Sequence, residues 1–311
     1  YKLWQEMKKQ ILLEDVEDVF NLETELFPCL VDMRFLGVRV DLDAAHKLKQ
    51  ELVAEEKKCL EKVWKETGVD VQIWAARSIE EVFKDQGLPY DKTPKTGAPS
   101  FTKNFLQNHP NEIVQLIARA REINKSHTTF IDTILKHQHN GRIHAEIRQL
   151  KGESGGTVTG RLSMSNPNLQ QVPARNKNIG PLIRSLFLPE ENHTWCSADF
   201  SQQEPRILTH YSHLSKYDGA SSIAEAYLEG DADFHQEVAN LVDIDRKTAK
   251  TIGLGIMYGM GKGKLADQLA VTVDEASDIL SKFNTYAPFV RELADSVMRS
   301  ANQKGYIKTL L

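Results

Sequence analysis

The sequence predicts an α+β fold that is mainly helical. Helical periodicity fills most of the first 140 residues, and three or four more helices are expected between residues 204 and 305. Between these parts, the Asn140-Gly141 turn is followed by the alternating segment RIHAEI, which indicates a strand of an antiparallel sheet. The change of pattern places a domain boundary near residue 140.

The first helical part opens with a helix and connector from Tyr1 to about Glu25. The segment LGVRVD then indicates a short strand after a glycine turn. A long amphipathic helix is predicted from Asp41 to Thr67, and Gly68 ends it. The apolar residues near helical spacing, which should face the core, are Leu48, Leu52, Cys59 and Val63.

Two further helices are predicted before the boundary. Ser78 and Glu81 have the spacing of a capping box, which would open a short helix that ends at Gly87. Pro110 is expected to open a long helix that continues to about His137.

Length and composition limit the class of protein. The 311 residues suggest about two domains, and 18 Gly and 11 Pro exclude a collagen-like or wholly disordered chain. No apolar run approaches the roughly 20 residues that span a bilayer, so no membrane partner is expected. The isolated Cys29, Cys59 and Cys196 favour a reducing compartment over a disulfide framework or zinc site.

The net charge of −4 does not make the whole chain a polyanion binder, but the charge is unevenly distributed. Residues 246–311 contain ten Lys or Arg against six Asp or Glu, and local charge decides nucleic-acid affinity. The chain begins without Met in a helical pattern and ends in the apolar run GYIKTLL. We therefore expect a fragment of a longer chain or one piece of a split protein.

A first candidate site lies in CSADFSQQEPR. Residues 194–200, TWCSADF, are predicted as a strand that ends at Asp199 and leads into a helix at about Glu204, with Pro205 at its first position. A carboxylate at such a strand end, with the carbonyl of Phe200 beside it, suits a hard cation such as Mg²⁺. The alternative is that Asp199 is only a helix cap or turn residue.

A second candidate site lies in DIDRKTAKTIGLGIMYGMG. Arg246, Lys250, Leu254 and Tyr258 are spaced by four residues, which predicts one slanted stripe on a helix. Two cations followed by an apolar and an aromatic residue suit a nucleoside triphosphate laid along the helix. The alternative is an amphipathic helix with a solvated basic edge.

The third candidate is the segment TVTGRLSMSNPNLQQVP, which lies within residues 154–175, a stretch without periodicity. One arginine among small hydrogen-bonding residues suits contact with phosphates and groove edges of a duplex. Alone, the segment is better interpreted as a generic surface loop.

Taken together, TGRLSxSxPNLQxxP, DFSQxE and RxxAKxxxxGxxYG, in this order and spacing, resemble the family A DNA polymerases of the bacterial polymerase I and phage replicative type. The resemblance covers essentially the whole chain and implies a right-hand polymerase fold. It implies the following parts: the end of an exonuclease-like domain and connector (1–25), the thumb (26–140), the first part of the palm (141–215), the fingers (216–304) and a return to the palm (305–311).

The resemblance also implies roles for single residues. Asp199 would be the first metal-binding aspartate of the palm, with the backbone carbonyl of Phe200 beside it. Glu204 would be the steric gate that excludes a ribose 2′-hydroxyl. Arg161 and Gln170 would contact the primer–template.

The remaining implied roles concern the incoming dNTP. His235, Arg246 and Lys250 would contact its phosphates, and Lys250 would also be the general acid toward the pyrophosphate leaving group. Leu254 would lie near the sugar, and Tyr258 would close the site near the templating base.

Three departures from the family pattern stand out. Leu254 replaces the usual Phe or Tyr, as in some phage members, and Gln203-Glu204-Pro205 replaces the more usual Ile-Glu-Leu. The second catalytic carboxylate, in a His-Asp-Glu motif, is not found in residues 1–311. We therefore expect truncation before that motif and a chain that is inactive alone.

The resemblance thus implies template-directed DNA synthesis in phage replication, with two Mg²⁺ ions, primer–template DNA and dNTP as partners, in the host cytoplasm. The missing palm segment or a processivity factor is a further expected partner. The alternative is a non-catalytic DNA-binding subunit, or half of a split polymerase completed by a partner chain.

Overall fold

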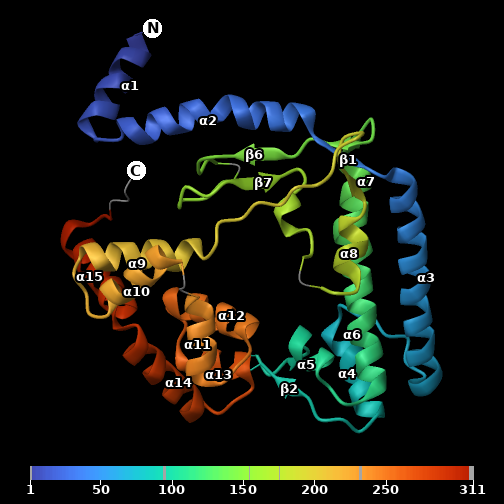
Figure 1. The fold of residues 1–311 in the computed structure, drawn as a ribbon. Coiled ribbons are helices and arrows are strands. Elements are labelled where there is room, and N and C mark those ends of the chain that lie inside the picture. The colour runs from blue at the N-terminus through green and yellow to red at the C-terminus, as the bar shows by residue number, and fades with distance from the viewer. Residues whose placement is uncertain (1, 94–95, 154, 175, 231–232, 308–311) are drawn as a thin grey trace. The chain divides into compact units, whose positions relative to one another are not determined.

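The computed structural model describes residues 2–93, 96–153, 155–174, 176–230 and 233–307. The chain divides into two compact units, Tyr1–Trp195 and Cys196–Leu311, which we call the first and the second unit. Both can be followed by colour in Figure 1.

The first unit combines helices with short strands. Its α-helices are α1 (Lys2–Leu13), α2 (Glu17–Leu36), α3 (Leu42–Thr67), α4 (Ala76–Asp85), α5 (Lys103–Gln107), α6 (Glu112–Lys125), α7 (Asp132–His137) and α8 (Ile179–Arg184). Its strands are β1 (Val38–Val40), β2 (Asp91–Lys92), β3 (Pro99–Ser100), β4 (Gln138–His139), β5 (Arg142–Ile143), β6 (Glu146–Arg148), β7 (Ser163–Ser165) and β8 (Phe187–Leu188). A π-helix, η1 (Ser126–Ile131), and a 3₁₀ turn, η2 (Leu169–Gln171), complete the described elements.

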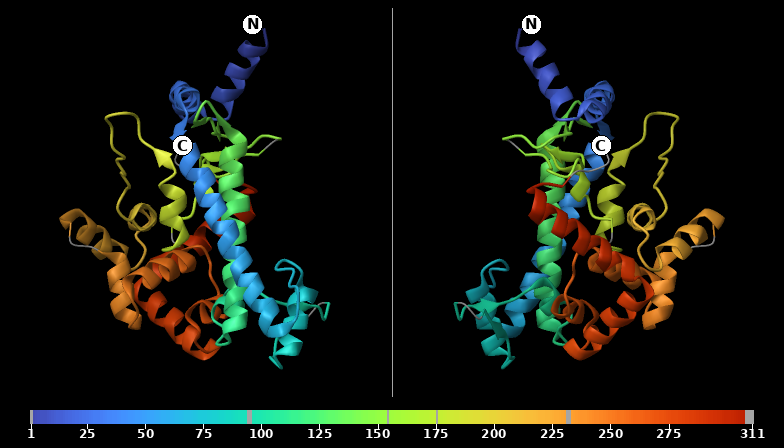
Figure 2. Two further views of the ribbon diagram at one scale, coloured as in Figure 1. Left: turned by 90° about the vertical axis from the view of Figure 1, so that its right-hand side faces the viewer. Right: turned by 90° about the vertical axis from the view of Figure 1, so that its left-hand side faces the viewer.

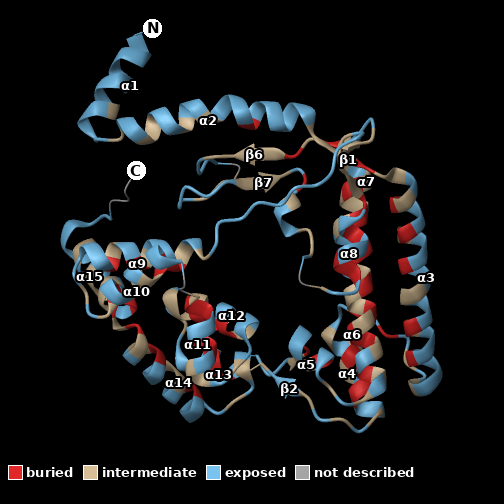
Figure 3. Cartoon of the chain, viewed as in Figure 1, coloured by how far each residue is buried: buried red, intermediate tan, exposed pale blue. Residues whose placement is uncertain are grey.

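Helices α3 and α6 form the framework of the first unit and run side by side in opposite directions (Figures 1 and 2). Asp41 begins α3 by accepting a hydrogen bond from the N–H of Ala44 at 2.9 Å, and Gly68, in the left-handed conformation, ends it. The buried residues lie on the facing sides of the two helices (Figure 3). The four predicted core residues of α3 are all buried: Leu48, Leu52, Cys59 and Val63.

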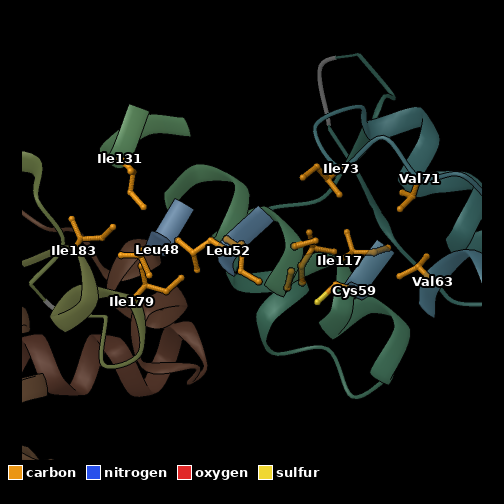
Figure 4. Close-up of a cluster of buried hydrophobic side chains, with 14 of the residues drawn as sticks. Leu48, Leu52, Cys59, Val63, Val71, Ile73, Ile117, Ile131, Ile179 and Ile183 are labelled. Carbon is orange, nitrogen blue, oxygen red and sulfur yellow. The ribbon is translucent and has the colours of Figure 1, made fainter. Parts of the chain in front are cut away.

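The same core extends beyond this helix pair. Figure 4 shows side chains from α3, α6 and α8, and from the segment before α4, gathered in one apolar cluster. The helix predicted from Pro110 to His137 is present as the consecutive elements α6, η1 and α7, and Asn111 caps its start. Within η1, His127 is buried and its Nε2 lies 2.6 Å from Oε2 of Glu56, which joins the π-helix to α3.

A four-stranded antiparallel sheet with the order β4-β5-β1-β8 joins distant parts of the first unit. In its register Val38 lies opposite Ile143, and Arg39 lies opposite Leu188. The strand predicted in LGVRVD is therefore confirmed, whereas RIHAEI forms two short strands, β5 in this sheet and β6, which pairs with β7. Because β1, which precedes residue 140, pairs with β5 and β8, which both follow it, this sheet spans the change of pattern, and the chain divides into compact units after Trp195.

The second unit is helical in its described part. Its helices are α9 (Gln203–Leu214), α10 (Ala220–Glu229), α11 (Phe234–Val242), α12 (Arg246–Met257), α13 (Lys262–Leu269), α14 (Val273–Tyr286) and α15 (Pro288–Lys304). Helix α11 packs against α12 and α14, with the aromatic rings of Phe234 and Phe283 fully buried between them. Gly253 of α12 is buried in this interface, where a Cβ atom would lie at ordinary contact distance, 3.9 Å, from the ring of Phe234.

Two local predictions are wrong. Residues 194–200 form no strand, because no strand within the described ranges pairs with them and all seven are exposed. The capping box of Ser78 is not formed either: Ser78 lies inside α4, and its Oγ accepts the N–H of Gln72 at 2.9 Å.

Two further expectations can be compared with the described part of the chain. No helix in it is long and apolar enough to cross a membrane. Cys29, Cys59 and Cys196 are free thiols, of which Cys59 is buried.

The α3–α6 interface generates a stability prediction. Ile117 of α6 has no exposed surface, so Ile117→Ala should lower the free energy of unfolding of the first unit by about 2–5 kcal/mol. Val53 of α3 is 43% exposed, and Val53→Ala should change it by less than about 0.5 kcal/mol. All four tryptophans lie in the first unit, so urea unfolding followed by tryptophan fluorescence reports on this unit. Equal losses in the two variants would contradict the assigned core.

Candidate functional site

Asp199 and Phe200 lie in an exposed extended segment that leads into α9. The alternative that Asp199 caps this helix is excluded, because Gln202 occupies the N-cap position. Within the described part of the chain, Asp199 has no hydrogen bond or ion pair, so its carboxylate is available to a ligand.

The donor chemistry of this segment fits a divalent cation. A carboxylate and a backbone carbonyl are hard oxygen ligands of the kind that Mg²⁺ binds, usually together with substrate phosphates and water. Among the described residues, however, no group of three or more His, Cys, Asp or Glu could hold a metal ion. Asp199 and Phe200 therefore supply only part of a ligand set.

The first turn of α9 is anchored to the helices that follow it. Gln202 adopts a left-handed conformation (φ 53°), and its Oε1 accepts hydrogen bonds from the Tyr227 hydroxyl at 3.2 Å and the Phe234 N–H at 3.0 Å. Two residues later, Oε1 of Glu204 accepts a hydrogen bond from the Tyr258 hydroxyl at 2.6 Å. The start of α9 is thereby joined to α10, to α11 and to the end of α12.

The predicted stripe on α12 is present. Asp245 caps the helix, Arg246 and Lys250 are exposed, Leu254 is half-buried, and Tyr258 is the C-cap with 70% of its surface exposed. Ala249, Ile252 and Gly253 of the same helix are buried. The structure thus gathers two cations, an apolar side chain and an aromatic ring on the accessible face of one helix.

Behind the cations lies the N-terminus of α11. Oδ1 of Asp233 accepts the backbone N–H groups of His235 and Gln236, and its Oδ2 forms an ion pair with Nε of Arg246 at 2.7 Å. Partial burial raises the pKa of Asp233. The hydrogen bond from Arg246 and those from the backbone N–H groups lower it by more, so the pKa lies below its ordinary value.

His235 is 2% exposed, and its Nδ1 has no hydrogen-bond partner. Burial lowers its pKa, and the nearby charges of Lys250 and Arg246 lower it further, against the opposing effect of Asp233. The imidazole is therefore neutral near pH 7, with an unsatisfied ring nitrogen beside the two cations.

Arg161 and Gln170 belong to the first unit, whereas the other predicted site residues belong to the second. Both are exposed. The carbonyl of Arg161 accepts the Thr157 hydroxyl at 2.6 Å, and Nε2 of Gln170 donates to the carbonyl of Leu162 at 3.1 Å. These bonds lie on either side of β7, in the segment between β6 and η2.

The model of DNA polymerase family A matches residues 42–311 of this chain. The chain belongs to DNA polymerase family A. The resemblance to this family that the sequence motifs indicate is therefore confirmed.

Relatives in this family include a DNA-directed DNA polymerase of Pseudomonas phage M6, which is 32% identical over 97% of this chain and 53% of its own length. DNA polymerase DpoZ of Acinetobacter phage SH-Ab 15497 is 32% identical over 100% of the chain and 56% of its own length. The thermostable DNA polymerase I of Thermus aquaticus is also 32% identical, over 93% of the chain. The resemblance is thus to phage enzymes as well as to bacterial polymerase I. The chain spans about half the length of these phage relatives.

A solved structure supports the predicted fold. The polymerase domain of Pol1 from M. smegmatis, in complex with DNA primer–template and dNTP, matches 93% of this chain and 51% of its own with a TM-score of 0.76 and 26% identity. The right-hand polymerase fold of this family A chain is thereby confirmed. The bounds of thumb, palm and fingers, and the roles of single residues, stay predictions.

Two residues of this arrangement were not predicted as part of the site. Asp233 precedes FHQ, and an acid three residues before Gln is a helix-start signal that the sequence does provide. Its pairing with Arg246, 13 residues later, depends on tertiary packing and has no local signal. Gln202 likewise accepts hydrogen bonds from Tyr227 and Phe234, which are distant in sequence, so no local pattern predicts these contacts.

The lowered pKa of His235 makes stability depend on pH. Between the lowered folded value and the unfolded value of about 6.5, the unfolded chain binds more protons, so stability present above pH 6.5 is lost as the pH falls. The urea midpoint of the chain, followed by circular dichroism, should therefore fall between pH 7.5 and 5.5. His235→Gln should reduce this fall. An NMR titration that gives His235 a pKa at or above 6.5 would contradict the prediction.

Proposed function

We propose that this chain carries the thumb (26–140), the first palm segment (141–215) and the fingers (216–304) of a template-directed DNA polymerase. Residues 1–25 would end an exonuclease-like domain and connector, and 305–311 would return to the palm. The observation that carries the proposal is the accessible stripe of α12, with Glu204 hydrogen-bonded to Tyr258 at its end. Family A membership supplies the reaction class.

The dNTP would lie along α12. Arg246 and Lys250, in the first turns, would bind its phosphates, because both positive charges lie on the accessible face of the helix. His235 lies close to these cations and would be a further polar contact. Leu254 would pack near the sugar, and Tyr258 would lie near the templating base.

The reaction would be attack of the primer 3′-hydroxyl on the α-phosphate of the dNTP, with release of pyrophosphate. Family A polymerases use divalent metal ions, and we propose two Mg²⁺, of which Asp199 and the Phe200 carbonyl would hold part of the ligand set. When bound, the ions would neutralise charge on the phosphates and activate the hydroxyl. Arg246 and Lys250 would hold the phosphates in line, and Lys250 would donate a proton to the leaving pyrophosphate.

Primer–template DNA would be the second substrate, contacted by Arg161 and Gln170 from the exposed loop of the first unit. Support comes from the M. smegmatis polymerase domain, which was solved with primer–template and dNTP. The phage relatives favour a role in phage DNA replication in the host cytoplasm, with a further palm segment or processivity factor as partner.

Template-directed selection of nucleotides tests this function directly. With a labelled primer–template and Mg²⁺, the next complementary dNTP should slow dissociation of the DNA–protein complex, and the three other dNTPs should not. Lys250→Ala should abolish this selective effect, because it removes a phosphate contact, while DNA binding without dNTP stays nearly unchanged. DNA affinity should fall steeply between 50 and 200 mM salt.

The same assay separates the alternatives. A non-catalytic DNA-binding subunit would bind the duplex with no response to the complementary dNTP, and that result would refute the proposal. Primer extension in parallel, with Asp199→Ala as the inactive control, measures whether the residues present also support chemistry.

Glu204 generates a prediction about sugar selection. As the gate, its side chain would exclude a 2′-hydroxyl, so Glu204→Ala should reduce the ratio of dNTP to rNTP affinity by about tenfold or more. The ratio is measured from the complementary dNTP and rNTP concentrations that stabilise the DNA complex.

Tyr258→Phe provides the matched control for Glu204→Ala. It removes the hydrogen bond to Glu204 but keeps the gate side chain, so the ratio should change much less. If Tyr258→Phe lowers the ratio as far as Glu204→Ala does, the hydrogen bond rather than the bulk of Glu204 selects the sugar.

A further inference from the structure

Asp233 has a separate interaction for each of its two carboxylate oxygens. Oδ1 accepts the backbone N–H groups of His235 and Gln236, each at 3.1 Å, and so caps α11. Oδ2 accepts the Nε–H of Arg246 at 2.7 Å. The proposed function gives this residue no role.

The ion pair holds Arg246 by one edge of its guanidinium group. Arginine carries five N–H donors in a rigid plane, and two of its nitrogens can bind one phosphate at the same time. Within the described residues, Asp233 is the only hydrogen-bond partner of Arg246, and it uses Nε. Both Nη groups are therefore left to a ligand, with the plane of the group already oriented.

The same carboxylate also fixes the start of the helix that carries His235. His235 is the second residue of α11, so the cap determines where its backbone begins. The N–H of Phe234, the first residue, is bound by Gln202 at 3.0 Å. A phosphate that meets Arg246 and His235 would thus meet two groups that one side chain has already set relative to each other.

We propose that Asp233 is a positioning residue, which orders Arg246 and His235 into one phosphate-binding arrangement before the triphosphate binds. This inference rests on the proposed function. Ordering a long side chain in advance reduces the entropy lost on binding, which strengthens the complex. The negative charge of Asp233 acts in the opposite direction, but the Asp233 and Arg246 side chains are 37% and 48% exposed, so solvent screens this repulsion.

Asp233→Asn separates the two functions of the carboxylate. Asparagine caps helices as well as aspartate does, but its single acceptor oxygen cannot serve both α11 and Arg246. The apparent Kd of the complementary dNTP on the DNA complex should rise about tenfold, which corresponds to 1.4 kcal/mol. In an Arg246→Ala background, Asp233→Asn should have no further effect, because the residue acts through Arg246.

Asp245→Asn is the matched control. Asp245 caps α12 by accepting the N–H groups of Lys247 at 3.0 Å and Thr248 at 3.1 Å, and it has no arginine partner in the described ranges. The substitution removes the same charge from a neighbouring cap, and the dNTP affinity should change less than twofold. Circular dichroism should show both variants as helical as the parent chain.

A dNTP affinity that is unchanged or tighter in Asp233→Asn would overturn the proposal. An equal loss of dNTP affinity in Asp245→Asn would overturn it as well. So would a loss of the same size when Asp233→Asn is introduced into the Arg246→Ala variant. Calorimetry of inorganic tripolyphosphate binding, without DNA, tests the role of Asp233 independently of the proposed function. If the parent chain shows no response to complementary dNTP, the function is refuted, whereas tripolyphosphate affinity that Asp233→Asn leaves unchanged refutes the role of Asp233.

Discussion

The packing of α11 against α12 is the constraint on which the candidate site depends. Ala249, Ile252 and Gly253 of α12 are buried in this packing. The predicted stripe, from Arg246 to Tyr258, therefore lies on the accessible side of the helix. Helical geometry then sets the order of charge, apolar surface and ring along that face. Gly253 lies in this interface, where a Cβ would be at ordinary contact distance, 4.0 Å, from Nδ1 of His235, a buried nitrogen without a hydrogen-bond partner in the described part of the chain.

The charges at this helix start are arranged against the usual preference. Helix N-termini favour acidic side chains, yet Arg246 and Lys250 lie in the first turns of α12. Two aspartates compensate: Asp245 binds the free N–H groups, and Asp233 binds Arg246. Lys250 has no ion pair in the described ranges, so part of the positive potential remains uncompensated. This positive charge at a helix N-terminus destabilises the helix, and a bound anion would offset it.

How much of this could be predicted from the sequence follows from the range of each interaction. The bounds of α3 and the stripe on α12 depend on periodicity and on caps within four residues, so local patterns sufficed. Residues 194–200 have the composition of a strand, but a strand also needs a hydrogen-bonded neighbour, which periodicity cannot supply. The Asp233–Arg246 pair and the anchoring by Gln202 required knowledge of which helices pack together.

The same reasoning explains the departure from the family pattern around Glu204. Helix α9 begins at Gln203, two residues before the position predicted from Pro205, so proline lies in the first turn rather than at the first residue. The N–H groups of the first turn have no acceptor within the helix, so proline there removes no hydrogen bond. Its buried ring takes the place of an apolar side chain, while Gln203 is exposed and can be polar without cost. Glu204, between them, keeps its place on the first turn and its hydrogen bond to Tyr258. The unusual neighbours of Glu204 are therefore compatible with the start of a helix, and the geometry of this helix start, rather than the identity of the flanking residues, holds Glu204 in position.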